Sequence, residues 1–348
     1  MKKTLIFAGA ALLALASCTK EDSNEPLPES SPICFRPGLT RATETTNANL
    51  SSIVVSGFMN GQLMIDKETY NKGSDGVFTS ANDYYWPGDD TPLTFYSYAP
   101  AAPGGTLTLT SDSKQLSGFS PAADIASQID FITATGTGRK STNEATGLAL
   151  DFSHRLAQIE VRAKTDNDTY TYEVTGVRIG RPVSSGSFDF TTNAWTLGSD
   201  KADYETTYTT PLTLNSTPQS VMGSAGNAML IPQQLTGWDP QTDASNTAEG
   251  AYISIKLRIA TAETGVQIYP FASNAECQWA AVKDDTKWEA GNKYIYTLDL
   301  THGAGYVDPK DPDPGTPVLG GPIKFTVQVQ PWTETTVEKP FDTGSESN

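Results

Sequence analysis

The chain has very little histidine and cysteine, with two and three of its 348 residues respectively. Neither His154 nor His302 is accompanied by a Gly-x-Ser-x-Gly nucleophile elbow, and serine-type catalysis needs a base that a third group orients. Three cysteines are too few for a disulfide framework in an exported protein. A structural zinc site needs clustered Cys or His ligands, which the sequence lacks. We therefore expect no enzymatic activity, no metal site and no cofactor.

Basic residues are also in the minority. The chain carries 24 Lys and Arg against 40 Asp and Glu, which gives a formal net charge of −16. Removing Lys2 and Lys3 with a leader would change this value to −18. Binding to nucleic acid relies on Lys and Arg that neutralise phosphates. Nucleic acid is therefore not an expected partner.

The apolar run near the start is short. Lys2 and Lys3 precede residues 5–16, and Leu15-Ala16-Ser17-Cys18 then places small residues before a cysteine. A membrane-spanning helix needs about 20 apolar residues, so residues 1–17 are expected to be a signal peptide. The cysteine resembles that of a bacterial lipobox, which implies acylation (palmitate) of Cys18 and an outer-membrane lipoprotein. The alternative is an ordinary signal peptide with an incidental cysteine.

Two further features extend this interpretation. Lys20-Glu21-Asp22 resembles the export signal of Bacteroidetes surface lipoproteins. Residues 18–32 are polar and rich in Glu, Ser and Pro, the composition of a flexible tether. The remaining cysteines, Cys34 and Cys277, are expected to be separate buried thiols, although a disulfide between them stays open.

Short runs of β-branched and aromatic residues, broken by Gly, Pro, Asn and Asp, follow the tether. Such runs with turn residues between them are typical of antiparallel sandwiches. Strands are expected at residues 53–55, 93–98, 148–152, 158–163, 170–174, 187–190, 228–231, 252–259, 293–300 and 323–330. In residues 252–259 the apolar side chains alternate strictly with the others, the period of a half-buried strand. Only residues 153–157 hint at a helix, so the expected fold class is all-β.

Several strings, taken in order along the chain, resemble the fimbrillin superfamily of Bacteroidetes, including its Mfa-like branch. In the first half they are Ile33-Cys34-Phe35 leading to Leu39-Thr40-Arg41-Ala42-Thr43, Tyr84-Tyr85-Trp86-Pro87, Leu93-Thr94-Phe95-Tyr96-Ser97-Tyr98-Ala99-Pro100, Asp130-Phe131-Ile132-Thr133-Ala134 and Leu150-Asp151-Phe152-Ser153-His154-Arg155-Leu156-Ala157. In the second half they are Ser185-Gly186-Ser187-Phe188-Asp189-Phe190, Met229-Leu230-Ile231-Pro232-Gln233, Trp288-Glu289-Ala290-Gly291-Asn292 and Phe325-Thr326-Val327-Gln328-Val329-Gln330-Pro331-Trp332.

The resemblance implies two tandem antiparallel β-sandwich domains of transthyretin-like or Greek-key type. With a boundary at the polar cluster near residue 165, the expected parts are residues 1–17 (signal), 18–41 (tether and removable strand), 42–165 and 166–348. The alternative for this cluster is a hairpin turn inside one domain. It also implies a structural or adhesive subunit of a fimbria (pilus), for cell adhesion and biofilm formation. The partners would be other fimbrial subunits, an arginine-specific protease and an unidentified surface receptor.

In such families the lipoprotein precursor is cut in its N-terminal segment, and a donor strand from a neighbouring subunit fills the groove left behind. Here Ile33 and Phe35 alternate with Cys34, so both can face one sheet as the removable strand. Arg41 lies among Thr, Gly and Pro, where a protease can reach it, and is the expected cleavage site. Arg36 is a second candidate, but Pro37 follows it and obstructs cleavage.

The sequence leaves one alternative function open. A surface glycan-binding lipoprotein would use Tyr84, Tyr85, Trp86 and Trp238 as sugar platforms, although β-sandwich cores also need large rings.

Residues 308–315 are an acidic, proline-rich stretch that we expect to be a solvated linker, with an incidental calcium site as the alternative. Residues 136–141 resemble a phosphate loop only superficially, since we expect them between two strands.

The C-terminal end bears on position within a filament. Residues 323–330 carry Ile323, Phe325, Val327 and Val329 on one face and are expected to close the protein's own sheet. The tail after Trp332 has only Val337 and Phe341 as large apolar residues. A strand that joins two subunits would present a longer alternating row. A tip or accessory subunit is therefore favoured over the main stalk.

Overall fold

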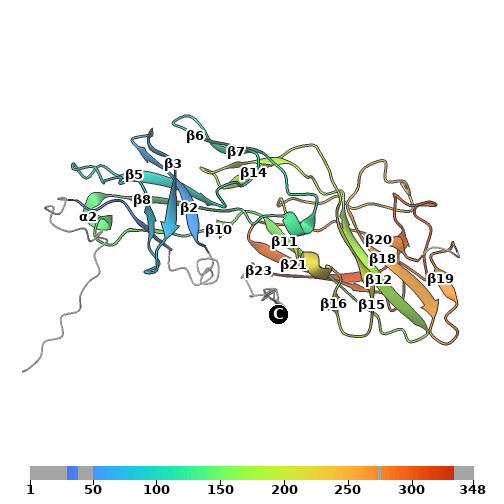
Figure 1. The fold of residues 1–348 in the computed structure, drawn as a ribbon. Helices are drawn as coiled ribbons and strands as arrows, with labels where there is room; N and C mark the ends of the chain where they lie inside the picture. The colour runs from blue at the N-terminus through green and yellow to red at the C-terminus, as the bar shows by residue number, and fades with distance from the viewer. Residues whose placement is uncertain (1–29, 38–49, 273–275, 333–348) are drawn as a thin grey trace, which may run out of the picture.

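The computed structural model describes residues 30–37, 50–272 and 276–332. The molecule is elongated, with β2, β3 and β5 towards one end and β12, β18 and β20 towards the other (Figure 1). Strands make up nearly all of its regular structure, so the all-β fold class is confirmed. Within the described ranges, helical structure is limited to α2 (Lys140–Asn143) and the 3-10 turns η1 (Ile125–Ser127) and η2 (Gly223–Ala225). No helix in these ranges is long and apolar enough to cross a membrane.

The first sheet has eight strands in the order β10-β8-β5-β2-β3-β4-β1-β9. Their bounds are β1 (Phe35–Pro37), β2 (Ser52–Met59), β3 (Gln62–Lys72), β4 (Phe78–Ser80), β5 (Leu93–Ala99), β8 (Ile132–Gly138), β9 (Leu148–Leu150) and β10 (Ser153–His154). The strand nearest the N-terminus thus lies between β4 and β9, three positions away from β2, the strand that follows it in sequence. This places β1 inside the sheet, with a neighbour on each side.

β2 illustrates why the central runs are continuously apolar. Ile53 and Val55 point into one core, together with Ile33, Phe35 and Leu148. Residues on the opposite face of β2 belong to a second core, which includes Val54 and Phe58. A strand buried on both faces has no exposed side to supply the polar half of an alternating pattern.

The second core is closed by a four-stranded sheet in the order β14-β13-β7-β6. Its strands are β6 (Thr106–Leu109), β7 (Lys114–Phe119), β13 (Gly186–Asp189) and β14 (Ala194–Leu197). Phe188 and Phe190 pack here against rings that include Phe131 and Trp195. The β13–β14 hairpin therefore packs against the sheet built from the first part of the chain.

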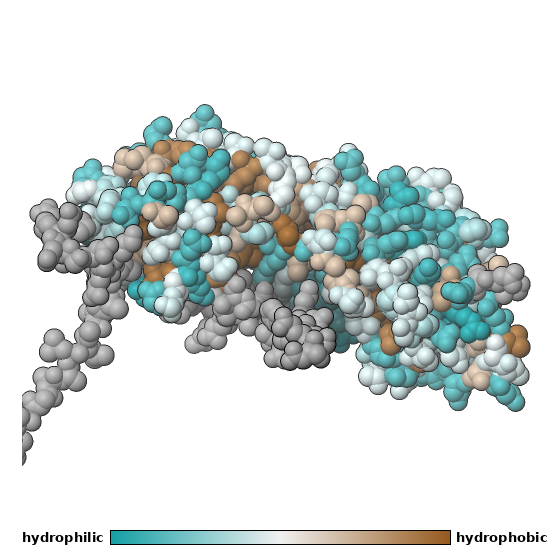
Figure 2. Space-filling view, viewed as in Figure 1, coloured by the Kyte–Doolittle hydropathy of each residue, from teal (hydrophilic) through white to brown (hydrophobic). Residues whose placement is uncertain are grey.

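Two further sheets share the third and largest core. One has the order β16-β11-β21-β23, with β17 paired to β11, and the other has the order β15-β12-β18-β20-β22, with β19 paired to β18. Their bounds are β11 (Ala157–Lys164), β12 (Tyr170–Gly180), β15 (Tyr204–Thr213), β16 (Gln219–Ser220), β17 (Ala228–Leu230), β18 (Tyr252–Thr261), β19 (Gln267–Tyr269), β20 (Gln278–Lys283), β21 (Asn292–Asp299), β22 (Tyr306–Val307) and β23 (Lys324–Pro331). Figure 2 shows mainly hydrophilic residues over the end of the molecule that carries β18 and β20.

Every strand expected from the sequence is present, and β18 has the expected alternation. Ile253, Ile255, Leu257 and Ile259 are buried, whereas Lys256 and Arg258 are half-buried. Two local expectations were wrong. Residues 153–157 form β10 and the start of β11 because they pair with β8 and β17. Residues 136–141 run from the end of β8 into α2, so they do form a strand-to-helix turn, although α2 has only four residues.

The division at residue 165 and the tandem-sandwich description stay predictions. β11 ends at Lys164 and pairs in parallel with β21. β13, later in the chain, pairs with β7. Sheets therefore take strands from both sides of residue 165.

Candidate functional site

The candidate site is the position that β1 fills between β4 and β9, which we call the β1 seat. Phe35 pairs antiparallel with Phe78 of β4 and in parallel with Leu148 of β9. The backbone N–H of Ile33 donates to the carbonyl oxygen of Tyr84 at 2.6 Å. The N–H of Leu148 donates to the carbonyl oxygen of Cys34 at 3.0 Å. The segment is thus held by main-chain hydrogen bonds along both of its edges.

The inner side of the seat is an apolar and aromatic pocket. Ile33 is 2% exposed and Phe35 is fully buried, and both belong to the same core. The ring of Phe35 meets Tyr70 and Phe95 edge-on, with centroids 4.8 Å and 5.0 Å apart. Burial raises the pKa of Tyr70 above its usual range, as expected for a phenol in an apolar pocket. Fully burying the side chains of Ile33 and Phe35 is worth about 1.5–3 kcal/mol each.

The segment between α2 and β9 also contacts the N-terminal segment. The backbone N–H of Ser31 donates to Oε1 of Glu144 at 3.2 Å. Cys34 is 2% exposed and lies against Gly147. Gly147 has φ of +74°, and a Cβ at this position would lie 3.1 Å from Sγ of Cys34. The close approach and the left-handed backbone both call for glycine here.

The structure describes some, but not all, of the residues expected to act in processing of the precursor. Cys18 and Arg41 lie outside the described residues. Arg36 has an exposed side chain, but its backbone pairs with Ala149 of β9. A protease needs an extended, accessible backbone, so this pairing adds to the obstruction by Pro37. Ile33 and Phe35 lie together as expected, and their removal stays a prediction.

The C-terminal strand lies at the edge of its sheet. All eight residues of β23 pair antiparallel with β21, so this strand closes the protein's own sheet. Trp332, directly after it, is 5% exposed and stacks on His154 with ring centroids 4.1 Å apart. Nδ1 of His154 lies 2.7 Å from Oδ2 of Asp130. His302, by contrast, is exposed in a bend.

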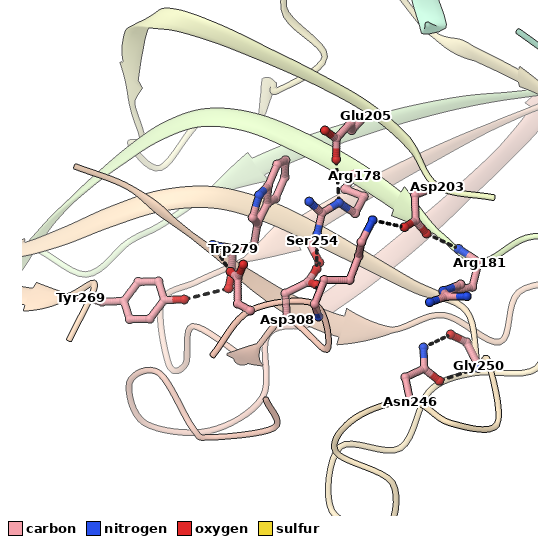
Figure 3. A network of polar contacts seen from close by, with 12 residues as sticks. Arg178, Arg181, Asp203, Glu205, Asn246, Gly250, Ser254, Tyr269, Trp279 and Asp308 are labelled. Carbon is pink, nitrogen blue, oxygen red and sulfur yellow. Dashed lines mark hydrogen bonds and ion pairs between the residues drawn. The ribbon is translucent and has the colours of Figure 1, made fainter. Parts of the chain in front are cut away.

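A buried polar network lies at the other end of the molecule (Figure 3). Nη1 of Arg178 lies 2.9 Å from Oδ2 of Asp308, and Nε of Arg178 donates to Glu205 at 2.8 Å. The guanidinium lies over the ring of Trp279, 4.1 Å from its centroid. Ser254 also donates to Asp308. This arrangement is a charge-paired structural contact.

The network corrects the expectation for residues 308–315. Asp308 is fully buried, so the stretch does not begin as a solvated linker. Its carboxylate is occupied by the guanidinium, a hydroxyl and the N–H of Lys310. Among the described residues, no group of three or more His, Cys, Asp or Glu could hold a metal ion. Cys277, expected to be buried, is half-buried because it lies in a loop before β20.

The aromatic residues considered as sugar platforms are mostly inside the protein. Trp86 is 3% exposed and Trp238 is 1% exposed, and both belong to hydrophobic cores. Tyr84 is half-buried beside Glu68, to which its hydroxyl donates. Tyr85 alone of the four is well exposed, at 44%. Trp86 and Trp238 are therefore core residues.

The sequence interpretation missed Glu144 and Gly147. A polar segment that ends in glycine is a recognisable helix C-terminal signal, so a turn near Gly147 was open to prediction. Its contact with Cys34 joins residues 113 positions apart and has no local signature.

Comparison with known proteins agrees with this architecture. The model of the fimbrillin-like family matches residues 40–332. A fimbrial protein from Bacteroides vulgatus has a similar structure, with a TM-score of 0.57, 16% identity, and coverage of 87% of this chain and 99% of that chain. Candidate cell adhesion proteins from Bacteroides uniformis and Bacteroides ovatus each give a TM-score of 0.50 at 16% identity, over 89% and 88% of this chain and 100% and 99% of their own.

Similarity at this level of identity shows the fold alone. No curated protein matches the chain. The family model, however, spans most of the sequence and confirms the resemblance seen in its motifs. The chain therefore belongs to the fimbrillin-like family.

Proposed function

We propose that this protein is a structural or adhesive subunit of a cell-surface fimbria, assembled by protease-triggered strand exchange. The observation that carries the proposal is the β1 seat. A short N-terminal strand fills an interior position of a sheet with two large side chains, and it is held by non-covalent contacts. The role is mechanical and adhesive, and no catalytic step is part of it.

The proposed cut at Arg41 falls between the end of β1 at Pro37 and the start of β2 at Ser52. After such a cut, β1 is a separate peptide that non-covalent contacts alone retain. Its loss would expose the facing edges of β4 and β9, together with the pocket of Phe35. Unpaired strand edges are templates for another strand, because main-chain hydrogen bonds supply affinity and side-chain pockets supply register.

The lipid provides delivery in this scheme. Acylation of Cys18 would hold the precursor in the outer membrane, exposed at the cell surface. The fragment that ends at Arg41 carries both the lipid and β1, so one cut would release the anchor and open the seat. The mature protein would then reside in the fimbrium.

The pairing of β23 supports a proposed position at the tip of the filament. Because all eight of its residues pair with β21, this strand is committed to the protein's own sheet. The tail beyond Trp332 has no alternating apolar row. A subunit that accepts a strand but donates none suits a tip, so we place the protein at the tip or in an accessory position.

The test is an Arg41→Ala variant expressed in the native cell. We expect a full-length lipoprotein that stays in the outer membrane and is absent from purified fimbriae. Arg139→Ala, which changes another exposed arginine, is the matched control and should enter fimbriae normally. If Arg41→Ala is incorporated, the Arg36→Ala/Arg41→Ala double variant follows. Incorporation of that variant as well would rule out cleavage-triggered assembly.

A further inference from the structure

We infer that the β1 seat selects its replacement strand by side-chain size, in the order large, small, large. We infer further that the replacement comes from a different protein and not from the C-terminal tail of a second copy. Both inferences rest on the proposed strand exchange. They concern which strand is accepted.

The two large positions are set by the inner pocket. Ile33 and Phe35 are buried in it, and the ring of Phe35 contacts the rings of Tyr70 and Phe95. Gly57 belongs to the same wall, since a Cβ there would lie 3.1 Å from the Phe95 ring. A replacement strand with small side chains at these positions would leave a cavity in a close-packed core.

The small position is set by the burial of Cys34 beside Gly147, the residue that directly precedes β9. A Cβ on Gly147 would lie 3.1 Å from Sγ of Cys34 and 3.2 Å from its carbonyl oxygen. The same carbonyl accepts the N–H of Leu148 at 3.0 Å, so the strand cannot move away without losing this bond. Gly147 is itself held by its N–H bond to the carbonyl oxygen of Asn143 at 2.8 Å. With Cys34 only 2% exposed, a larger side chain has no open space to enter.

The tail of a second copy does not offer this pattern. In residues 333–348 the two large apolar residues, Val337 and Phe341, are four positions apart, and Pro340 lies between them. Side chains on one face of a strand are two positions apart. No triplet in the tail therefore places two large side chains around a small one.

Phe325-Thr326-Val327 is the nearest pattern in the C-terminal region. These residues already pair with Leu298, Thr297 and Tyr296 of β21. The expected partner is therefore another protein with an extended segment that carries an aliphatic, a small and an aromatic residue in succession. In the orientation of β1, this segment would run parallel to β9 and antiparallel to β4.

Binding of synthetic peptides tests the selection. The full mature chain is cut with an arginine-specific protease and titrated with a fluorescent peptide of residues 30–37, and unlabelled peptides then compete for the site. We expect the Cys34→Ala peptide to compete within about threefold of the native one, and the Cys34→Leu peptide to be at least tenfold weaker. The peptide of residues 333–348 should not compete. Equal competition by Cys34→Leu, or competition by the tail peptide, would overturn the inference while strand exchange stands.

A second measurement separates the selection by side-chain size from the proposed strand exchange. In the uncut chain, Cys34→Leu should lower the thermal midpoint by roughly 2–4 °C or more through overpacking, whereas Cys34→Ala should lower it less. If the uncut chain behaves in this way but no peptide exchanges after cleavage, the proposed strand exchange fails, and the selection of a partner fails with it. If Cys34→Leu leaves the midpoint unchanged, the small position itself is wrong.

Discussion

The indole of Trp332 lies nearly parallel to the imidazole of His154, with 4.1 Å between ring centroids and 12° between ring planes. Trp332 directly follows β23, whereas His154 belongs to β10 of the first sheet. The N–H of Trp332 also donates to the carbonyl oxygen of Gly291 at 2.8 Å. The end of the last strand is thus fixed against the sheet built from the first part of the chain.

Trp332→Ala should destabilise the protein by about 3–5 kcal/mol, because it removes a large buried ring and leaves a cavity. Urea denaturation followed by circular dichroism measures the effect. Val329→Ala is the control, since Val329 lies on the same strand but is 53% exposed, and it should change stability by about 0.5 kcal/mol or less. Similar midpoints for the two variants would contradict the buried role of Trp332.

Asp308→Ala should cost about 3–5 kcal/mol, because it removes the buried carboxylate at Nη1 of Arg178 and leaves this buried guanidinium with Glu205, which is 47% exposed, as its remaining carboxylate partner. The Arg178→Met/Asp308→Leu double variant removes both charges and should recover much of this loss. Denaturation of the Arg178→Met and Asp308→Leu single variants and of the double variant gives the coupling free energy, expected at about 0.5–3 kcal/mol. Additive losses would show that the two side chains stabilise the fold independently.

Asp284 should make stability depend on pH. It is 1% exposed, and burial raises the pKa of its carboxyl group, although Thr286 opposes this through hydrogen bonds from its N–H and hydroxyl. Between the ordinary pKa and the raised value, the folded state holds a proton that the unfolded state has lost, so this group's contribution to stability falls as pH rises. Asp284→Asn keeps the acceptor oxygen and removes this titration. The difference in unfolding free energy, variant minus native, should therefore grow between pH 4 and pH 7, and a constant difference would contradict the shift.

Cys18→Ala should abolish lipid attachment and leave the precursor unprocessed or mislocalised. Metabolic labelling with a radioactive fatty acid checks this directly. Cys277→Ala, which changes a cysteine far from the leader, should keep its label. Continued labelling of Cys18→Ala would refute the lipoprotein interpretation.

The sequence predicted features that depend on local pattern. Alternation predicted β18, and the spacing of Ile33 and Phe35 predicted that both would face one core. The sequence did not predict β15. This strand is threonine-rich and largely exposed at a sheet edge, so it lacks an apolar alternation. Long-range partners were also missed. Asp308 is buried because Arg178 pairs with it from 130 residues earlier in the chain, and the small position at Cys34 depends on Gly147.

The β13–β14 hairpin packs on β7, and Trp332 packs in the second core. These contacts have a mechanical consequence. Parts of a chain that touch through a small polar interface move relative to one another by default, but a large hydrophobic interface suppresses this motion. Here the second core contains Val54 from near the start of the described chain, Phe188 from its middle and Trp332 from its end. A filament that included this subunit would bend at the joints between subunits, and the subunit itself would act as a stiff segment.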